Sequence, residues 1–165
     1  MVIVAETMLF TTLVGGYLVL RGAGGQWPPP GQPRLPIALT WVNTLVLLSS
    51  CLTMSRAWRA MKSGDDRRLR SSLMATAMLG ATFLTIQGSE WARLVRFGMT
   101  LSSSIYGATF YALIGLHGLH VLAAVAWLGF ISLSRRKPGA DLCAIYWFYV
   151  CGLWAFLFPL VYLIP

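Results

Sequence analysis

Charged residues are scarce in this sequence, far scarcer than in an ordinary soluble domain. Only 11% of the 165 residues are charged, and 57% are hydrophobic, whereas roughly 25% of the residues of a soluble domain carry charge. Acidic residues are rarer still, with five in the whole chain. This composition excludes a soluble globular protein and predicts that lipid surrounds most of the chain.

Cysteine is also sparse, and its positions limit the chemistry that the chain can carry. The three cysteines form no C-x-x-C pair, and each lies inside an apolar segment, where a thiol behaves as a small hydrophobic group. We therefore expect no disulfide among Cys51, Cys143 and Cys151. A signal peptide is not expected either, because the first apolar run lacks a basic start and contains Glu6. We expect the first helix to be retained.

Five apolar segments are long enough to be membrane-spanning helices, which need roughly 20 residues each. Breaker-rich or charged stretches separate them, for example GAGGQWPPPGQPRLP at residues 22–36. Residues 97–134 contain no Asp, Glu, Lys or Arg, and we interpret them as a loop and one long helix. The sequence therefore predicts an all-α polytopic membrane protein with a five-helix bundle, forming one membrane domain over residues 1–165, with spans at about 1–20, 36–56, 71–91, 103–133 and 142–163.

The formal net charge of +8 lies in the loops between the apolar segments. Five spans place nine cations on the side of the N-terminus and four on the other side, so the positive-inside rule predicts a cytoplasmic N-terminus and an external C-terminus. Contact with anionic lipid headgroups is a second role for the nine. No basic helix face interleaved with aromatic residues indicates nucleic-acid binding. The nine are Arg56, Arg59, Lys62, Arg67, Arg68, Arg70, Arg135, Arg136 and Lys137, and the four are Arg21, Arg34, Arg93 and Arg96.

Glu6 is the one charged residue of the first apolar segment. At 1.5 Å per residue it lies about 8 Å along a helix that begins at Met1, in or near the cytoplasmic edge of the hydrocarbon layer. A charge is costly there, so we expect a neutral carboxyl or one paired with a cation or polar neighbour, which makes Glu6 a functional candidate. The alternative is that the helix begins later and that Glu6 touches headgroup water.

Glu90 stands beside Trp91 and Arg93 at the end of the third apolar segment, a pattern typical of the outer membrane interface. A solvated or arginine-paired carboxylate costs little at that depth. We therefore predict a structural role for this interface carboxylate.

Two histidines, His117 and His120, lie three residues apart in GLHGLH, near the middle of the fourth span and on one face of its helix. A haem with two axial histidines needs them on opposite sides of the iron, and a di-iron site needs more carboxylates than Glu6 and Glu90 offer from opposite membrane edges. We predict no metal site and no catalytic residue. Both imidazoles are expected to be neutral and hydrogen-bonded to a neighbouring helix or subunit.

Small residues form a stripe at i, i+4 and i+8 in the fourth span, at Ser104, Ala108 and Ala112. Such a stripe favours close approach of another helix, and we interpret it as a packing surface. Uncharged polar groups in the spans are expected to form hydrogen bonds between helices. They are Asn43, Gln87 and Thr109.

The most specific motif is IYGATFYALIGLHGLHVLAAVAWL at residues 105–128. It resembles a helix of subunit III of the haem-copper oxidases (cytochrome c or quinol oxidase subunit 3), in which a YGSTFF-like run containing Tyr106 and Gly107 leads into a GxHGxHV run. The order of other motifs is similar to that family over nearly the whole chain, in a short form without the first two of seven helices. These are AETMLF at 5–10, WPP at 27–29, NTLVLLSS at 43–50, GSEW at 88–91 and YWFYVCGLWAFLFPLVYLIP at 146–165.

The resemblance implies an accessory subunit without a redox centre, in the cytoplasmic membrane of a bacterium. Its partners would be the catalytic subunit I, which holds haem and copper, other respiratory subunits, and membrane lipid including bound phospholipid. In such complexes subunit III stabilises subunit I and supports proton uptake in aerobic electron transport. The matching carboxylate, Glu6, would lie toward the proton-entry side. We expect the first, third and fourth spans to contact the partner.

Two departures separate this sequence from the family pattern. The last helix of relatives reads YWHF-x-D, but Phe148 and Cys151 occupy the His and Asp positions here. Serines at 102–104 replace the acidic residue that usually precedes the YGSTFF-like run. An alternative is therefore an accessory protein of a nitric oxide reductase or of a quinol oxidoreductase–oxidase supercomplex. A small transporter or channel would need more intramembrane polar residues, and an independent enzyme would need a nucleophile or cofactor motif.

Overall fold

The computed structural model describes residues 2–23, 27–30, 35–134 and 139–164. Every regular element in this part of the chain is helical, which confirms the predicted all-α fold. Within these described ranges, five helices are long and apolar enough to cross a membrane. The fourth runs without a break from Ile105 to Leu133 and the fifth from Ala140 to Leu163, and each includes a π-helical turn. The elements are α1 (Val2–Ala23), α2 (Ile37–Ser63), α3 (Asp66–Arg96), α4 (Ile105–Phe110), the π-helical turn η1 (Tyr111–Gly115), α5 (Leu116–Leu133), α6 (Ala140–Phe158) and the π-helical turn η2 (Pro159–Leu163).

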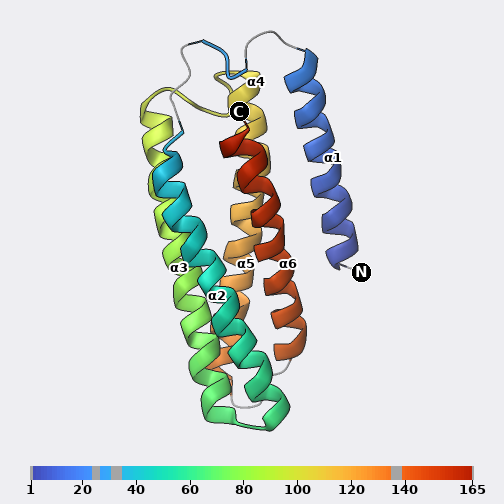
Figure 1. Cartoon of the computed structure of the whole chain (residues 1–165), viewed down its shortest axis with the longest axis vertical. Helices are drawn as coiled ribbons and strands as arrows, with labels where there is room; N and C mark the ends of the chain where they lie inside the picture. Colours follow the sequence, from blue (N-terminus) through green and yellow to red (C-terminus); the bar gives the residue numbers. More distant parts are fainter. Residues whose placement is uncertain (1, 24–26, 31–34, 135–138, 165) are drawn as a thin grey trace.

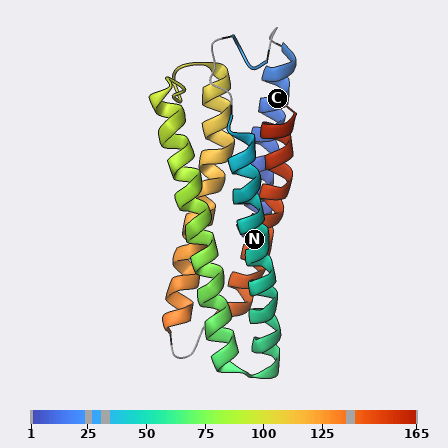
Figure 2. The same cartoon turned by 60° about the vertical axis from the view of Figure 1, so that its left-hand side comes forward.

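The helices run along one long axis and alternate in direction (Figure 1). Helices α2 and α3 form a long hairpin, α5 packs against α3, and α6 packs against both α2 and α5. Helix α1 stands at the edge of this group, against the α4–η1 segment. Its N-terminal end lies beside the middle of α6, whereas α2 and α3 continue well beyond that level (Figures 1 and 2).

Local chemistry fixes the sharp turns between the helices. Gly64 ends α2 in a left-handed conformation (φ 70°), which glycine adopts without steric cost. Asp65 then begins α3, because its side chain accepts a hydrogen bond from the backbone N–H of Arg68 at 3.0 Å. Ser104 begins α4 in the same way by accepting from Gly107 N at 3.0 Å. Polar residues at these positions therefore define where each helix starts.

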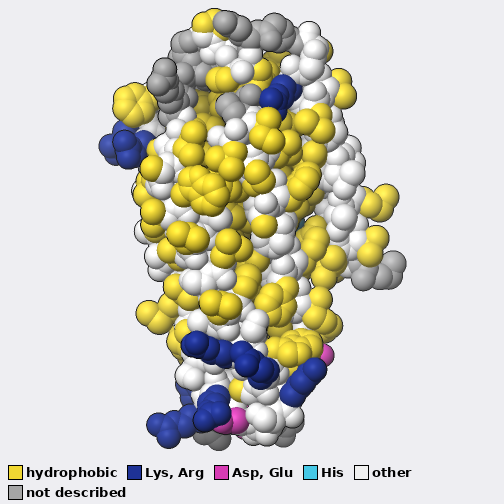
Figure 3. All heavy atoms as spheres, viewed as in Figure 1, with side chains coloured by type: hydrophobic (Ala, Val, Ile, Leu, Met, Phe, Trp, Pro, Cys, Tyr) yellow, Lys and Arg dark blue, Asp and Glu magenta, His cyan; other side chains and the backbone are white. Residues whose placement is uncertain are grey.

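Large aromatic side chains fill the centre of the bundle. Trp147 and Trp154 of α6 and Phe83 of α3 are 0% exposed. The Trp147 ring reaches α3 at Gly80, where a Cβ atom would lie 2.5 Å from that ring. The outer surface is also largely apolar over the middle of the molecule (Figure 3), as expected for helices that face lipid.

The helices are longer than several of the predicted spans. Helix α2 continues to Ser63 and α3 already begins at Asp66, so both carry basic residues on helical turns that the sequence analysis assigned to a loop. Gly64 and Asp65 alone make the tight connection. The charged turns therefore extend the hairpin past its apolar part, and the single-domain organisation stays a prediction.

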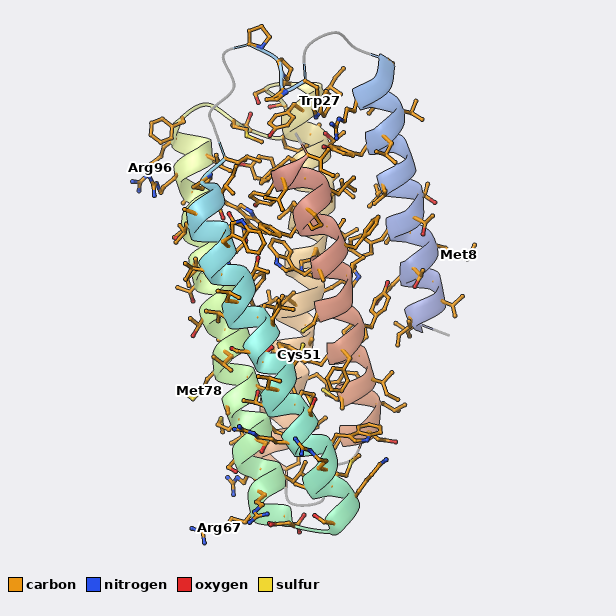
Figure 4. The ribbon with its side chains drawn as sticks, in the orientation of Figure 1. Met8, Trp27, Cys51, Arg67, Met78 and Arg96 are labelled. Atoms are coloured by element: carbon orange, nitrogen blue, oxygen red, sulfur yellow. The ribbon has the colours of Figure 1, made fainter. Side chains whose placement is uncertain are left out.

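The described cations separate to the two ends of the bundle. Figure 4 shows Arg67 at the α2–α3 loop end and Arg96 near the opposite end. By their positions in the helices, Arg56, Arg59, Lys62, Arg68 and Arg70 share the end of Arg67, and Arg21 and Arg93 share that of Arg96. The other four cations of the topology prediction, Arg34, Arg135, Arg136 and Lys137, lie outside the described residues.

Candidate functional site

A carboxylate, an imidazole and a phenol meet where α1 faces α5 and α6. Nε2 of His120 lies 3.6 Å from Oε1 of Glu6, and the hydroxyl of Tyr146 donates a hydrogen bond of 3.1 Å to the same oxygen. The side chains of His120 and Glu6 are 15% and 14% exposed. Three helices thus bring together three titratable groups in a largely enclosed place.

The other nitrogen of His120 determines how protons are arranged in this site. Nδ1 of His120 lies 2.7 Å from the carbonyl oxygen of Leu116, so it must carry a hydrogen to donate. Nε2 is then the ring nitrogen that can accept or release a proton, and it faces the carboxyl group of Glu6.

Aromatic and hydroxyl groups close the site. Phe10 packs edge-on against the ring of His120, with 5.4 Å between ring centroids. One turn along, Thr7 donates to the hydroxyl of Tyr149 at 3.3 Å, a second polar link between α1 and α6. Oε2 of Glu6 is buried and has no hydrogen-bond partner among the described residues. The site therefore keeps one oxygen of the carboxyl group able to accept or carry a proton.

The depth of Glu6 differs from the sequence prediction. The carboxyl was expected in or near the cytoplasmic edge of the hydrocarbon layer, but it lies beside His120, well inside the helix that runs from Ile105 to Leu133. The expectation assumed that α1 begins at the membrane edge, whereas its first turn stands beside the middle of α6 (Figure 1). The polar partner that the prediction required is present, and it is one of the two histidines.

His117 has a different environment from His120, although the two were predicted to share one face and one kind of partner. The ring of His117 is 0% exposed and stacks on Trp154, with 5.1 Å between centroids. Neither ring nitrogen has a hydrogen-bond partner among the described residues. The expected hydrogen bond is therefore not seen, and His117 acts here as a flat packing group in the core.

Glu90 is buried within a second polar network, not solvated or arginine-paired as expected. Its side chain is 0% exposed. It accepts hydrogen bonds from Thr40 of α2 at 2.9 Å and from Gln87 at 2.9 Å. The side-chain amide of Gln87 also donates a hydrogen bond of 3.2 Å to the hydroxyl oxygen of Tyr162 in η2. The neighbouring Trp91 and Arg93 led us to predict an interface position with access to water, but α2 and η2 cover the carboxylate of Glu90.

Asn43 extends this second network toward the middle of the bundle. Its amide donates to the backbone carbonyl of Phe83 at 3.2 Å and to Gln87 Oε1 at 3.4 Å. Asn43 and Gln87 thus bond between helices, as predicted. Thr109 bonds only within its own helix, to the carbonyls of Ile105 and Tyr106 at 2.9 and 3.0 Å.

The small-residue stripe is only partly covered by the described part of the chain. Ala112 is exposed and Ser104 and Ala108 are half-buried. The close contacts come from glycines on other sides: a Cβ on Gly107 would collide with the carbonyl of Thr100, and one on Gly118 would lie 2.7 Å from the Trp91 ring. Tyr106 of the same motif is buried, edge-on to Trp27. Packing of the stripe against another subunit stays a prediction.

The two departures in the last helix have different surroundings. Phe148 is 37% exposed and points to the outer surface, so its phenyl ring needs no polar partner. Cys151 is buried, and its sulfur lies 4.0 Å from the hydroxyl of Ser50. That serine also accepts a hydrogen bond of 3.0 Å from the indole of Trp147. A small thiol therefore fills a position where a carboxylate would need further donors.

Several residues of both networks were not identified from the sequence. Tyr146 and Tyr149 lie at i and i+3 on α6, and Thr40 and Tyr162 face Glu90 from two different helices. Hydroxyl groups spaced along one face of an apolar helix are the signal that could have revealed them. No group of three or more metal-ligating side chains occurs within the described ranges.

Comparison with known proteins identifies the family. The family model described as "Cytochrome c oxidase subunit III" matches residues 1–164. A relative from Synechocystis named "Cytochrome c oxidase subunit 3" is 33% identical, with the match covering 98% of this chain and 72% of the relative. Relatives of the same name from Thermostichus vulcanus and Bacillus subtilis are 34% and 32% identical, covering 98% and 96% of this chain and 83% and 80% of those proteins. The chain therefore belongs to the cytochrome c oxidase subunit III family.

Proposed function

We propose that this chain works as a non-catalytic accessory subunit of a respiratory haem-copper oxidase and that Glu6, His120 and Tyr146 form its functional site. Membership of the subunit III family over the whole length supports the first part. The enclosed contact between Glu6 and His120 supports the second, since it is the one carboxylate–histidine pair among the described residues.

The redox groups belong to the partner in this proposal. The haem and copper lie in catalytic subunit I, and this chain stabilises that subunit, with the first, third and fourth spans and bound phospholipid contributing to the contact. The arrangement of the two histidines in this chain agrees with redox groups that lie in the partner. His117 packs against Trp154 and His120 faces Glu6, so the two imidazoles do not converge on one point.

The site supports proton uptake because it can hold a proton inside the membrane without a net charge. In the neutral state that we propose, one proton lies on the carboxyl group or on Nε2 of His120, and Tyr146 donates to the carboxyl oxygen. A second proton would make the pair cationic and a lost proton would make it anionic. Both charged states are costly in a largely enclosed site. When one proton arrives, release of another therefore restores the neutral pair.

Replacing Glu6 by Gln tests this role. The amide retains an oxygen that can accept from Tyr146, but it cannot carry a proton. We expect slower proton uptake or a shorter turnover lifetime of the oxidase, with an unchanged haem spectrum. Thr12→Val is the matched control on α1, because Thr12 bonds only to the carbonyl of Met8 and faces outward. A changed haem spectrum, or an uptake rate and a turnover lifetime that both equal those of the control, would contradict the proposal.

The distribution of basic residues supports one orientation of the chain in the membrane. We place the chain in the cytoplasmic membrane of a bacterium, with the N-terminus on the cytoplasmic side and the C-terminus outside. Among the described residues, Arg56, Arg59, Lys62, Arg67, Arg68 and Arg70 lie at the α2–α3 loop end, and this excess supports a cytoplasmic loop. Labelling of a cysteine introduced at Ser63 from one side of sealed membranes tests it.

A further inference from the structure

Guanidinium groups gather in a hollow between α2 and α3 at their loop end. Figure 3 shows basic side chains crossing this end of the molecule, below a broad apolar surface. The hollow has a volume of about 540 Å³. It is lined by Arg56, Arg59, Ala60, Ser63, Arg68 and Ser72.

Helical spacing explains why these side chains face one gap. Arg56, Arg59 and Ser63 are separated by three and four residues on α2, and Arg68 and Ser72 are separated by four on α3. The tight turn at Gly64 holds the two rows opposite each other. The arrangement is therefore part of the helical hairpin and does not depend on a loose loop.

Positive charge in the hollow is poorly balanced. Arg68 pairs with Asp65, with 3.2 Å between Nε and Oδ2. Arg56 and Arg59 form no ion pair with a carboxylate in the described part of the chain, and Nε of Arg59 donates only to the carbonyl of Ser55 at 3.4 Å. Guanidinium groups placed side by side repel each other and favour an anion between them, above all a phosphate that accepts several N–H groups.

An apolar groove begins at the same place. A second hollow of about 310 Å³ lies between α2 and α6. Arg59 lines this hollow as well, and the apolar lining consists of Trp58, Ile145 and Phe148. Ile145 and Phe148 are 46% and 37% exposed, so the groove opens on the surface that faces lipid. A charged hollow and an apolar groove thus share one arginine.

We propose that this end of α2 binds one anionic phospholipid. Arg56 and Arg59 hold the phosphate, with Arg68 at the far side of the hollow. The first part of an acyl chain lies along Trp58, Ile145 and Phe148. A free phosphate ion would use only the basic hollow, whereas a phospholipid uses both hollows, which favours the lipid. The proposal concerns this chain's membrane contacts and holds whatever the role of Glu6.

Lipid retention by the intact complex tests the proposal. The complex that purifies with this chain is placed in phosphatidylcholine nanodiscs that contain some phosphatidylglycerol, extracted with detergent, and weighed by native mass spectrometry. We expect one more phosphatidylglycerol per complex than in the double variant Arg56→Gln/Arg59→Gln, in which retention falls about tenfold. Arg67→Gln/Arg70→Gln is the matched control, because it removes equal charge at the same end but from a different hollow.

A further variant separates lipid from free phosphate. Ile145→Asn changes the apolar groove and no residue of the basic hollow, so it should lower phosphatidylglycerol retention without changing the binding of inorganic phosphate. Equal lipid loss in both double variants would show diffuse attraction to anionic membranes and would overturn the proposal. Unchanged phosphatidylglycerol retention in Arg56→Gln/Arg59→Gln would also overturn the proposal. The same holds if that variant loses a protein subunit but keeps its lipid. None of these readings uses oxidase activity, so they are independent of the proposed function.

Discussion

Nε2 of His120 lies 3.6 Å from the carboxylate of Glu6, and this contact joins α1 to the centre of α5. Helix α1 has few other interior contacts, since Phe10 and Tyr17 are its buried residues among those described. The same pair therefore helps to hold α1, together with the links of Glu6 to Tyr146 and of Thr7 to Tyr149, and it places an ionisable group inside the bundle. In the proposed function, proton handling depends on these two side chains.

Glu6 and His120 should be energetically coupled. Glu6→Gln and His120→Gln each remove one ionisable group of the contact, so the double variant should lose much less stability than the sum of the single losses. Contacting pairs of this kind show coupling of about 0.5–3 kcal/mol. Thermal unfolding of the purified complex in mild detergent, followed for wild type, both single variants and the double variant, measures the coupling.

The control for this cycle pairs Glu6 with a residue that it does not touch. Glu6→Gln combined with Thr82→Val should give additive losses, because Thr82 is exposed on α3 and bonds only to the carbonyl of Met78. Additivity in the Glu6 and His120 cycle as well would show that the two side chains do not act as a unit.

The buried Glu90 network should be sensitive to loss of either partner. Thr40→Val removes a donor from a carboxylate that is 0% exposed, which should cost about 1–3 kcal/mol. Glu90→Leu should cost more because it removes the acceptor that Thr40 and Gln87 share, leaving them only the Pro36 carbonyl and the Tyr162 hydroxyl as acceptors among the described residues. Ser89→Ala is the neighbouring control, because Ser89 is exposed and bonds within its own turn. Denaturant titration in detergent checks the order; a Glu90→Leu variant as stable as Ser89→Ala would refute it.

Two glycines of α3 should respond oppositely to alanine. A Cβ at position 80 would lie 2.5 Å from Trp147 and 2.7 Å from Val125, whereas one at Gly88 would meet nothing within 4 Å. Gly80→Ala should therefore destabilise the bundle by about 1–3 kcal/mol through overpacking. Gly88→Ala should be neutral or stabilising by up to about 1 kcal/mol, because alanine favours a helix. Equal melting temperatures of the two variants would contradict the tight packing of Trp147 and Val125 on Gly80.

The two histidines should tolerate phenylalanine differently. His117→Phe keeps the stack on Trp154 and removes no hydrogen bond seen among the described residues, so the complex should remain as stable as wild type. His120→Phe leaves Glu6 without its imidazole and should destabilise the complex and slow proton uptake. Melting curves and uptake rates of both variants test this contrast, and a greater loss for His117→Phe would reverse the assignment.

Much of the fold could be predicted from the sequence because its signals are local. Apolar runs of membrane length and the breaker-rich stretch before α2 each act within a few positions. The family resemblance likewise rests on consecutive residues such as YGATF and GLHGLH, and the family match confirms it. The helical extension of α2 and α3 past their apolar parts was missed because hydropathy marks the spans and not the helix ends.

The site could be predicted only in part because its contacts are not local. Glu6 was chosen for its cost in lipid, but its pairing with His120 depends on how far α1 is offset along the bundle, and hydropathy carries no information on that offset. Glu90 was misplaced for the same reason. Its exposure depends on Thr40 and Tyr162, which approach from other helices. Pairing between distant helices is thus the step that the sequence leaves open.

The central claim, that the chain is an accessory subunit of a haem-copper oxidase, is tested most directly by tagging it and purifying it from its native membrane in mild detergent. The optical spectrum and metal content of what purifies with it are then recorded. The account predicts a co-purifying catalytic subunit with haem and copper, and no haem on the separated chain. Haem without copper would indicate a nitric oxide reductase partner, and a chain that arrives alone or carries its own haem would contradict the account.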